Sequence, residues 1–277
     1  MSLTVAAALS AARLRIPSAE ASLLLAEATG RGKVWLIAHD DEVLPDDVAA
    51  RFDDWVQRRE RGEPVAYILG WREFYGHRFA VAPGVLIPRP ETELLVEEGI
   101  AAVASVTSPR ILDLGTGSGC IAISLALARP DAQVWAVDFS ADALKIAAAN
   151  AEALGARVEF TRSDWASGLC ERDFDLIVSN PPYIAPDDEH MGQGDLRFEP
   201  RTALAAADAG LADLRRIAEA AAGLLKPGAT LLCEHGWDQA GFVREIVVAK
   251  GFSPLQYRDL AGIVRVTGGV KSEVAGR

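Results

Sequence analysis

From Arg110 onward, short apolar runs alternate with segments of helical spacing, and this alternation constrains the fold more than any other feature. The runs are rich in β-branched residues, as buried strands are. Their sequences are RILDLG, QVWAVDFS, RVEFTRSD, FDLIVSN and ATLLCEHG. A helix over GLADLRRIAEAAAGLLKPG leads into the last of them. Such alternation predicts an α/β fold with a parallel sheet, helices on both faces, and ligands at the carboxyl ends of the strands.

The end of the chain follows a different pattern. Two more strands, FSPLQYRDL and GIVRVTGG, follow each other around Ala261-Gly262. They predict a reversed hairpin, and hence a mostly parallel seven-stranded sheet with one antiparallel strand. We expect the tail, residues 270–277, to be disordered.

The N-terminal part has helical periodicity up to about residue 62. Val48, Phe52 and Val56 share one helical face, and Gly30 is a helix stop signal. Residues 64–81 alternate and carry aromatics, which predicts a hairpin, and a stiff proline-rich loop follows. These patterns predict three parts: a small helical N-terminal domain at 1–75, a hairpin and proline-rich linker at 76–90, and an α/β domain at 91–277.

Charge and cysteine usage exclude several classes of function. The net charge of −11 opposes the accumulated Lys and Arg that phosphate backbones require, so we expect no stable nucleic-acid binding. The 3 cysteines are far apart and odd in number, which predicts neither a disulfide framework nor a metal site. No apolar run reaches membrane-spanning length. These features predict a cytoplasmic protein without a membrane partner.

A glycine-rich loop, DLGTGSGC, follows the first strand of the alternating region and precedes an apolar helix. Glycines at this position let the backbone approach a ligand closely at the helix N-terminus. The spacing departs from the dinucleotide fingerprint, whose last glycine would fall at Cys120, and from a nucleophile elbow around Ser118. The alternative is a purely structural turn. The candidate cofactor-binding residues are Gly115, Thr116, Gly117, Ser118 and Gly119.

Two further strand ends carry side chains suited to a nucleoside. Asp138 ends the second strand, where a carboxylate can accept both hydroxyls of a ribose. Its alternative role, capping the next helix, is already served by Ser140. Trp165 follows the third strand, where an aromatic ring can contact an adenine, although it can equally belong to the core.

These three strand ends resemble those of the adenosylmethionine-dependent methyltransferases. In that family the glycine loop, the ribose-binding acid and the adenine pocket occupy the same places. The resemblance covers about residues 85–267. It implies a Rossmann-like fold and S-adenosyl-L-methionine as the cofactor.

The fourth strand ends in Asn180-Pro181-Pro182-Tyr183, which we interpret as the catalytic and substrate-binding motif. Asn180 offers a side-chain carbonyl and Pro181 a main-chain carbonyl, while prolines withhold competing N–H donors. Such a site is suited to receive an –NH₂ group, and Tyr183 can stack on the flat system that bears it. Held by two acceptors, the nitrogen is aimed at the methyl group for in-line transfer. The alternative is a turn capped by an asparagine.

The whole chain resembles the peptide chain release factor glutamine methyltransferases, the HemK/PrmC family, over about residues 10–267. The stretches that carry the resemblance are LIPRPETELLVE, DLGTGSGCIAISLA, SNPPYI and FEPRTAL. It implies methylation of the glutamine in the Gly-Gly-Gln loop of class-one release factors, by a catalytic domain at 91–277 with a substrate-recognition domain at 1–75. It also implies that Gly115 through Gly119, Asp138, Trp165 and Asn180 contact the cofactor, and that Asn180 through Tyr183 hold the glutamine.

Two other functions remain open at this point. A nucleic-acid amino methyltransferase acting on adenine or guanine would have to grip phosphates, which the acidic charge opposes. A catalytically silent cofactor-binding module would have no need of an intact acceptor motif.

Several flanking residues are ambiguous. Arg89 and Glu91 either position the substrate or pin the two domains through a salt bridge. The segment 187–195 has the composition of a mobile flap. The histidines are expected to be structural or exposed rather than ligands: His77, His190 and His235.

Overall fold

The computed structural model describes residues 3–188 and 192–272. The chain divides into two compact units, Met1–Trp71 and Arg72–Arg277. Within the described residues, no helix has both the length and the apolar character needed to cross a membrane.

The first unit is helical, as predicted. Its helices are α1 (Val5–Ala12), α2 (Ser18–Thr29), α3 (Lys33–Ala38), α4 (Asp46–Glu60) and α5 (Val65–Leu69). They enclose a core that includes the fully buried Leu24 and Leu25 of α2 and Phe52 and Val56 of α4. Gly30 ends α2 with a left-handed backbone, φ +67°.

The predicted hairpin over 64–81 was wrong in its first part. Pro64 precedes a helix, α5, because its fixed φ suits the start of a helix. Only the remainder forms the hairpin, with strands β1 (Trp71–Phe74) and β2 (His77–Ala80). Asn150 anchors this hairpin: its side chain accepts from Ala80 N at 2.7 Å, and donates to Ala80 O at 3.0 Å and to Ser118 O at 2.9 Å.

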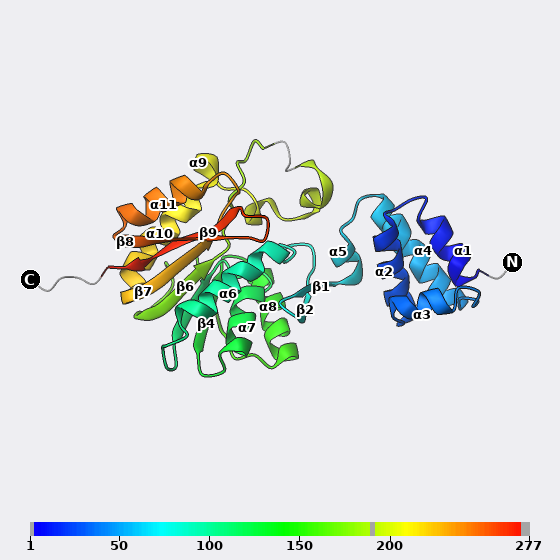
Figure 1. Cartoon of the computed structure of the whole chain (residues 1–277), viewed down its shortest axis with the longest axis horizontal. Helices are drawn as coiled ribbons and strands as arrows, with labels where there is room; N and C mark the ends of the chain where they lie inside the picture. Colours follow the sequence, from blue (N-terminus) through cyan, green and yellow to red (C-terminus); the bar gives the residue numbers. More distant parts are fainter. Residues whose placement is uncertain (1–2, 189–191, 273–277) are drawn as a thin grey trace, which may run out of the picture. The chain divides into compact units, whose positions relative to one another are not determined.

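The second unit contains the predicted mostly parallel sheet (Figure 1). The strand order is β5-β4-β3-β6-β7-β9-β8, in which β9 runs antiparallel to both of its neighbours, β7 and β8. Strands β3 and β6 are neighbours in the middle of the sheet. The chain adds β4 and β5 beyond β3 on one side, and β7 to β9 beyond β6 on the other, so the direction of strand addition reverses between β3 and β6. The strands are β3 (Arg110–Leu114), β4 (Gln133–Asp138), β5 (Glu159–Arg162), β6 (Phe174–Ser179), β7 (Leu225–Glu234), β8 (Phe252–Arg258) and β9 (Val264–Lys271).

Helices cover both faces of this sheet (Figure 1). One face packs against α6 (Glu93–Ala102), α7 (Cys120–Ala128) and α8 (Ala141–Leu154) through buried side chains such as Leu125. The other packs against α10 (Ala212–Leu224) and α11 (Ala240–Ala249) through Ile217 and Val247. Short helices fill the connections: η1 (Pro90–Thr92), η3 (Gly194–Phe198), η4 (Arg201–Ala203) and α9 (Ala207–Gly210).

Two boundaries differ from the predictions. Strand β7 begins at Leu225, directly after α10, so Lys226-Pro227-Gly228 lies within the strand rather than at the end of the predicted helix. The β6–β7 register shifts there, and such a bulge tolerates a proline that has no N–H to donate. Strand β9 extends to Lys271, so the predicted disorder from residue 270 was wrong for the first two residues; residues 273–277 lie outside the described part.

Candidate active site

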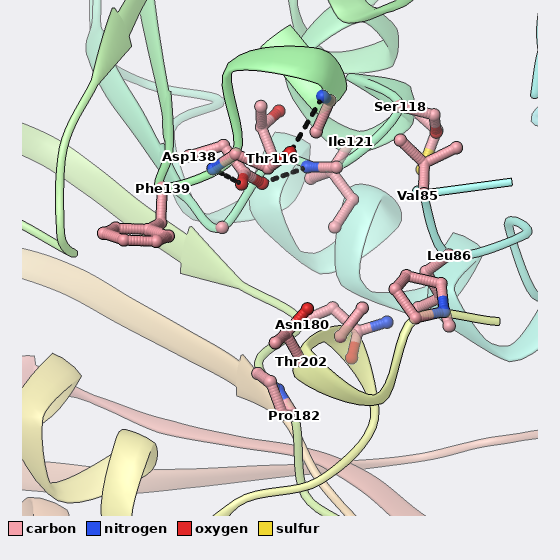
Figure 2. Close-up of a pocket in the computed structure, with 18 of the residues that line it drawn as sticks. Val85, Leu86, Thr116, Ser118, Ile121, Asp138, Phe139, Asn180, Pro182 and Thr202 are labelled. Atoms are coloured by element: carbon pink, nitrogen blue, oxygen red, sulfur yellow. Dashed lines mark hydrogen bonds between the residues drawn. The ribbon is translucent and has the colours of Figure 1, made fainter. Parts of the chain in front are cut away.

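A pocket of about 280 Å³ lies at the carboxyl ends of β3, β4, β5 and β6. This is where the strand order reverses, the place at which open α/β sheets bind ligands. Figure 2 shows Thr116, Ile121 and Asp138 on one side of the pocket and Asn180, Pro182 and Thr202 on the other. Of the predicted site residues, the pocket is lined by Gly115, Thr116, Gly117, Ser118, Asp138, Trp165, Asn180 and Pro182.

The glycine loop turns through backbone conformations that favour glycine. Gly119 has φ +83°, and a Cβ there would lie 2.9 Å from Ile123 Cδ1 and 3.0 Å from Ala147 Cβ. Gly115 has φ +78°, and its Cβ would lie 3.1 Å from Trp165 Cζ3. Both positions therefore need glycine for the left-handed turn and for close packing.

Asp113, which directly precedes this loop, is hydrogen-bonded to it. Its Oδ2 accepts from the Thr116 hydroxyl at 2.6 Å. Its Oδ1 is buried without a hydrogen-bond partner among the described residues. Burial raises the pKa of Asp113 to about 7.

Asp138 ends β4 and braces the loop across the pocket. Its Oδ2 accepts from Gly117 N at 2.8 Å, and its Oδ1 accepts from Ser140 N at 2.8 Å. Ser140 caps α8, accepting from Ala143 N at 3.2 Å, so Asp138 is not needed as the helix cap. A carboxylate held this way keeps lone pairs for a ligand hydroxyl.

An aromatic pair frames the same end of the pocket. Phe139, which the sequence analysis missed, lines the pocket with 68% of its surface exposed. An exposed aromatic directly after an acid at a strand end was the available signal. Trp165 also lines the pocket; its Nε1 donates to Asp213 Oδ1 at 3.1 Å, and it packs partly against the core. Trp165 therefore takes part in both the core and the pocket.

Asn180 presents an unsatisfied acceptor at the opposite end. Its Nδ2 donates to Thr92 Oγ1 at 3.1 Å, whereas its Oδ1 is buried and has no hydrogen-bond partner within the described chain. A buried acceptor that forms no hydrogen bond costs about 1–3 kcal/mol, so its presence in a pocket indicates that a ligand donates a hydrogen bond to it. The strand end before Asn180 is fixed by the Ser179 hydroxyl, which donates to Leu114 O at 2.6 Å.

The other three residues of the Asn-Pro-Pro-Tyr motif differ in whether they line the pocket. Pro182 lines the pocket, whereas Pro181 and Tyr183 are not among its described lining residues. The Tyr183 hydroxyl donates to Glu234 Oε1 at 3.3 Å, and burial raises the pKa of that phenol above its usual value. The sequence analysis missed Thr92 and Glu234 as partners of this motif.

Arg89 lines the pocket and forms an ion pair with Glu199, whose side chain is fully buried. Glu199 Oε2 also accepts from Ile87 N at 3.2 Å. The ion pair joins two stretches of the second unit, so it gives no support to the interpretation in which Arg89 and Glu91 pin the two domains together.

The remaining ambiguous features are settled in part. His235 is buried and contacts Gly236 O and Thr267 Oγ1, each at 2.8 Å, which makes it structural. His190 and the centre of the predicted 187–195 flap lie outside the described residues. In the part of the chain that the structure describes, no cluster of His, Cys, Asp and Glu could hold a metal ion.

Comparisons with known proteins cover both units. The PrmC N-terminal domain model matches residues 4–70, and the Methyltransferase small domain model matches residues 90–194. The release factor glutamine methyltransferase of Bordetella pertussis is 51% identical over 92% of this chain and 95% of the relative. The corresponding protein of Neisseria gonorrhoeae is 50% identical, with 91% and 93% covered.

Among solved structures, a T. thermophilus 16S rRNA methyltransferase in complex with AdoMet and guanosine has a TM-score of 0.55. It is 20% identical, and the likeness covers 73% of this chain and 49% of that one. At this identity it shows the fold alone, which agrees with the predicted methyltransferase fold.

Proposed function

This chain belongs to the release factor glutamine methyltransferase family, and from that premise we propose how its pocket carries out the reaction. The enzyme transfers a methyl group from S-adenosyl-L-methionine to the side-chain amide nitrogen of a glutamine in peptide chain release factors. The unsatisfied Asn180 Oδ1 carries the assignment of the reacting end of the pocket.

The residues at the other end fit the cofactor. The turns at Gly115 and Gly119 bring main chain to the pocket, and Asp138 offers carboxylate lone pairs to the ribose hydroxyls. Phe139 and Trp165 offer aromatic surface to the adenine. When bound, the cofactor supplies a methyl group activated by a positively charged sulfur.

At the reacting end, Asn180 and Pro181 orient the amide. Asn180 Oδ1 accepts one N–H of the glutamine amide and the Pro181 carbonyl accepts the other. Both hydrogens are then held, so the nitrogen turns its remaining face toward the methyl group. After methyl transfer the amide nitrogen loses one of its protons to water and becomes a neutral N-methyl amide, so no strong base is needed at this end of the pocket.

Tyr183 is proposed to stack on the glutamine amide, with its ring set by the hydrogen bond to Glu234. Burial raises the pKa of the phenol, so it stays protonated at neutral pH. Tyr183 therefore acts by contact rather than as a general base.

We further propose that the acceptor is the glutamine of the Gly-Gly-Gln loop of class-one release factors. The N-terminal part, predicted to extend to about residue 75, would supply contacts that place this loop in the pocket. Binding energy from such remote contacts is used to orient the reacting group. This assignment rests on the family and on the acidic charge, which disfavours a nucleic-acid acceptor.

The choice of acceptor is tested by mass spectrometry after incubation with cofactor. An intact release factor is expected to gain about 14 Da, one methyl in place of one hydrogen, on the glutamine of that loop. A short Gly-Gly-Gln peptide is expected to be a far poorer substrate. Deleting Met1–Trp71 should reduce activity on the release factor much more than on the peptide.

The controls are cofactor affinity and cooperative melting of the shortened chain, which show that the catalytic unit is still folded. DNA and ribosomal RNA are incubated in parallel. Methyl groups appearing there, with none on the release factor, would contradict the proposal in favour of a nucleic-acid amino methyltransferase.

Cofactor binding is tested at Asp138. Asp138→Ala removes the acceptor for the ribose hydroxyls and is expected to weaken S-adenosyl-L-methionine binding by about 1–3 kcal/mol, measured by calorimetry. The matched control is Asp142→Ala, because Asp142 is exposed and forms an ion pair with Lys145 on the surface of α8. Equal affinities in the two variants would remove Asp138 from the cofactor site.

A further inference from the structure

The proposed chemistry requires the oxygen of the Asn180 side chain, and not its –NH₂, to face the substrate. The two ends of an asparagine amide have nearly the same shape, so packing alone discriminates poorly between them. A hydrogen-bond partner on the far side must fix the orientation. In this structure the partner is Thr92, which is 2% exposed and whose Oγ1 accepts from Asn180 Nδ2 at 3.1 Å.

A hydroxyl, however, can donate as well as accept. If Thr92 donated its proton to the Asn180 amide, the amide would reverse and place its –NH₂ toward the pocket. The –NH₂ of Asn180 would then face the –NH₂ of the substrate, and two hydrogen-bond donors cannot bind each other. The direction of the Thr92 proton therefore decides whether the site accepts an amino group.

Glu234, at the end of β7, is placed to take that proton. Glu234 is 2% exposed, and its Oε1 accepts from the Tyr183 hydroxyl at 3.3 Å. Its Oε2 is buried and has no hydrogen-bond partner among the described residues, and the Thr92 hydroxyl lowers the pKa of this carboxyl. An ionised carboxylate can only accept hydrogen bonds. The Tyr183 hydroxyl donates to Oε1, and the unpaired Oε2 is available to accept the Thr92 proton, which would leave the lone pairs of Thr92 to Asn180.

We propose that Thr92 and Glu234 are positioning residues that fix the Asn180 amide with its oxygen toward the substrate, Glu234 taking the Thr92 proton and Thr92 taking the Asn180 N–H. This inference rests on the proposed role of Asn180. It links Thr92 in η1 and Glu234 in β7 to Asn180 after β6. These three residues are far apart in the sequence, so no local pattern predicts that they act together.

The ionisation of Glu234 adds a consequence for pH. Burial raises the pKa of Glu234 to about 7; Glu91 also raises it, whereas Arg265 and the hydroxyls of Thr92 and Tyr183 lower it. Above this pH the carboxylate form predominates and accepts both protons. Below it, a protonated Glu234 can donate to Thr92 and release the amide, so kcat should fall as the pH drops through about 7.

The main test compares Thr92→Val with Thr92→Ser in the full-length enzyme acting on an intact release factor. Thr92→Val keeps the shape but removes the acceptor. We expect kcat to fall by about 5- to 150-fold, as for a buried polar group left unpaired, while KM for the release factor stays near wild type. Thr92→Ser keeps the hydroxyl and should restore most of kcat.

Thr230→Val is the matched control, since Thr230 is also buried and lies on the same strand as Glu234. It should leave kcat unchanged. Wild-type kcat in Thr92→Val, or an equal loss in Thr92→Val and Thr92→Ser, would overturn the proposal.

Glu234→Gln provides a second, independent test. The glutamine has the same shape but carries an amide N–H that can donate to Thr92, so kcat should fall and its decline below about pH 7 should disappear. In the double variant with Thr92→Val the loss should not exceed that of the worse single variant, because both act through one contact. Additive losses would contradict the proposed relay.

The outcome is separable from that of the proposed function. Normal turnover in Asn180→Ala would contradict the role of Asn180 itself. Loss in Asn180→Ala together with normal turnover in Thr92→Val and Glu234→Gln would contradict only the relay.

Discussion

Asn180→Ala is expected to lower turnover on a release factor by about two to four orders of magnitude, the range for loss of a key orienting or electrostatic contact. The substitution removes the Asn180 side-chain oxygen, a pocket-lining buried acceptor that has no partner among the described residues. The substrate amide would then be held at one hydrogen only and would rotate away from the in-line geometry. Single-turnover kinetics at saturating cofactor measure the effect.

Asn180→Asp is the matched control for this variant. An aspartate keeps an acceptor oxygen toward the pocket in either orientation, so its loss should be smaller than that of alanine. Near-normal turnover in Asn180→Ala would show that another group orients the amide.

Gly210→Ala is expected to lower turnover about 100-fold, the cost of a misplacement of about 1 Å at a reacting group. Gly210 ends α9 with φ +83°, and a Cβ there would lie 2.0 Å from the main-chain oxygen of Tyr183 and 2.7 Å from Gln239 Nε2. Because the obstacle is backbone, the added methyl must displace the chain next to Pro182. The measurement is kcat, accompanied by thermal unfolding.

The control is Gly223→Ala within α10, where a Cβ would meet nothing within 4 Å. Since alanine has the higher helix propensity, this variant should be neutral or more stable by up to about 1 kcal/mol. Wild-type turnover in Gly210→Ala would mean that the main chain at Tyr183 has room to shift without harm.

The sequence was sufficient for the strands and for the two motifs because each is written in a short stretch. Alternation predicts strand ends, and the glycines and prolines at those ends have direct backbone consequences. Thr92 and Glu234 could not be found this way, since Asn180 meets Thr92 across 88 residues and Tyr183 meets Glu234 across 51. Neither residue stands in a pattern that predicts a contact.

Errors arose where a local signal had two readings. Residues 65–69 are apolar and include one aromatic and two β-branched residues, as strands often do, yet a helix follows Pro64 there. Lys226-Pro227-Gly228 is typical of a helix stop, yet a shift of register lets the strand contain it. At the second place the pairing with the neighbouring strand β6, rather than the local pattern, decides the structure.

The pairing of two acceptors with no donor also determines what happens after the reaction. An unmethylated amide brings two N–H groups, whereas the methylated product has only one, so one acceptor of the pair from Asn180 and Pro181 loses its partner. Such a loss costs about 1–3 kcal/mol, which makes the affinity of the enzyme for the product about 5- to 150-fold weaker than its affinity for the substrate. We therefore expect the methylated release factor to dissociate readily, to inhibit the enzyme weakly and to accept no second methyl group. Inhibition as strong as substrate binding, or a dimethylated glutamine in the mass spectrum, would contradict this. The same unsatisfied oxygen that recognises the substrate would also release the product.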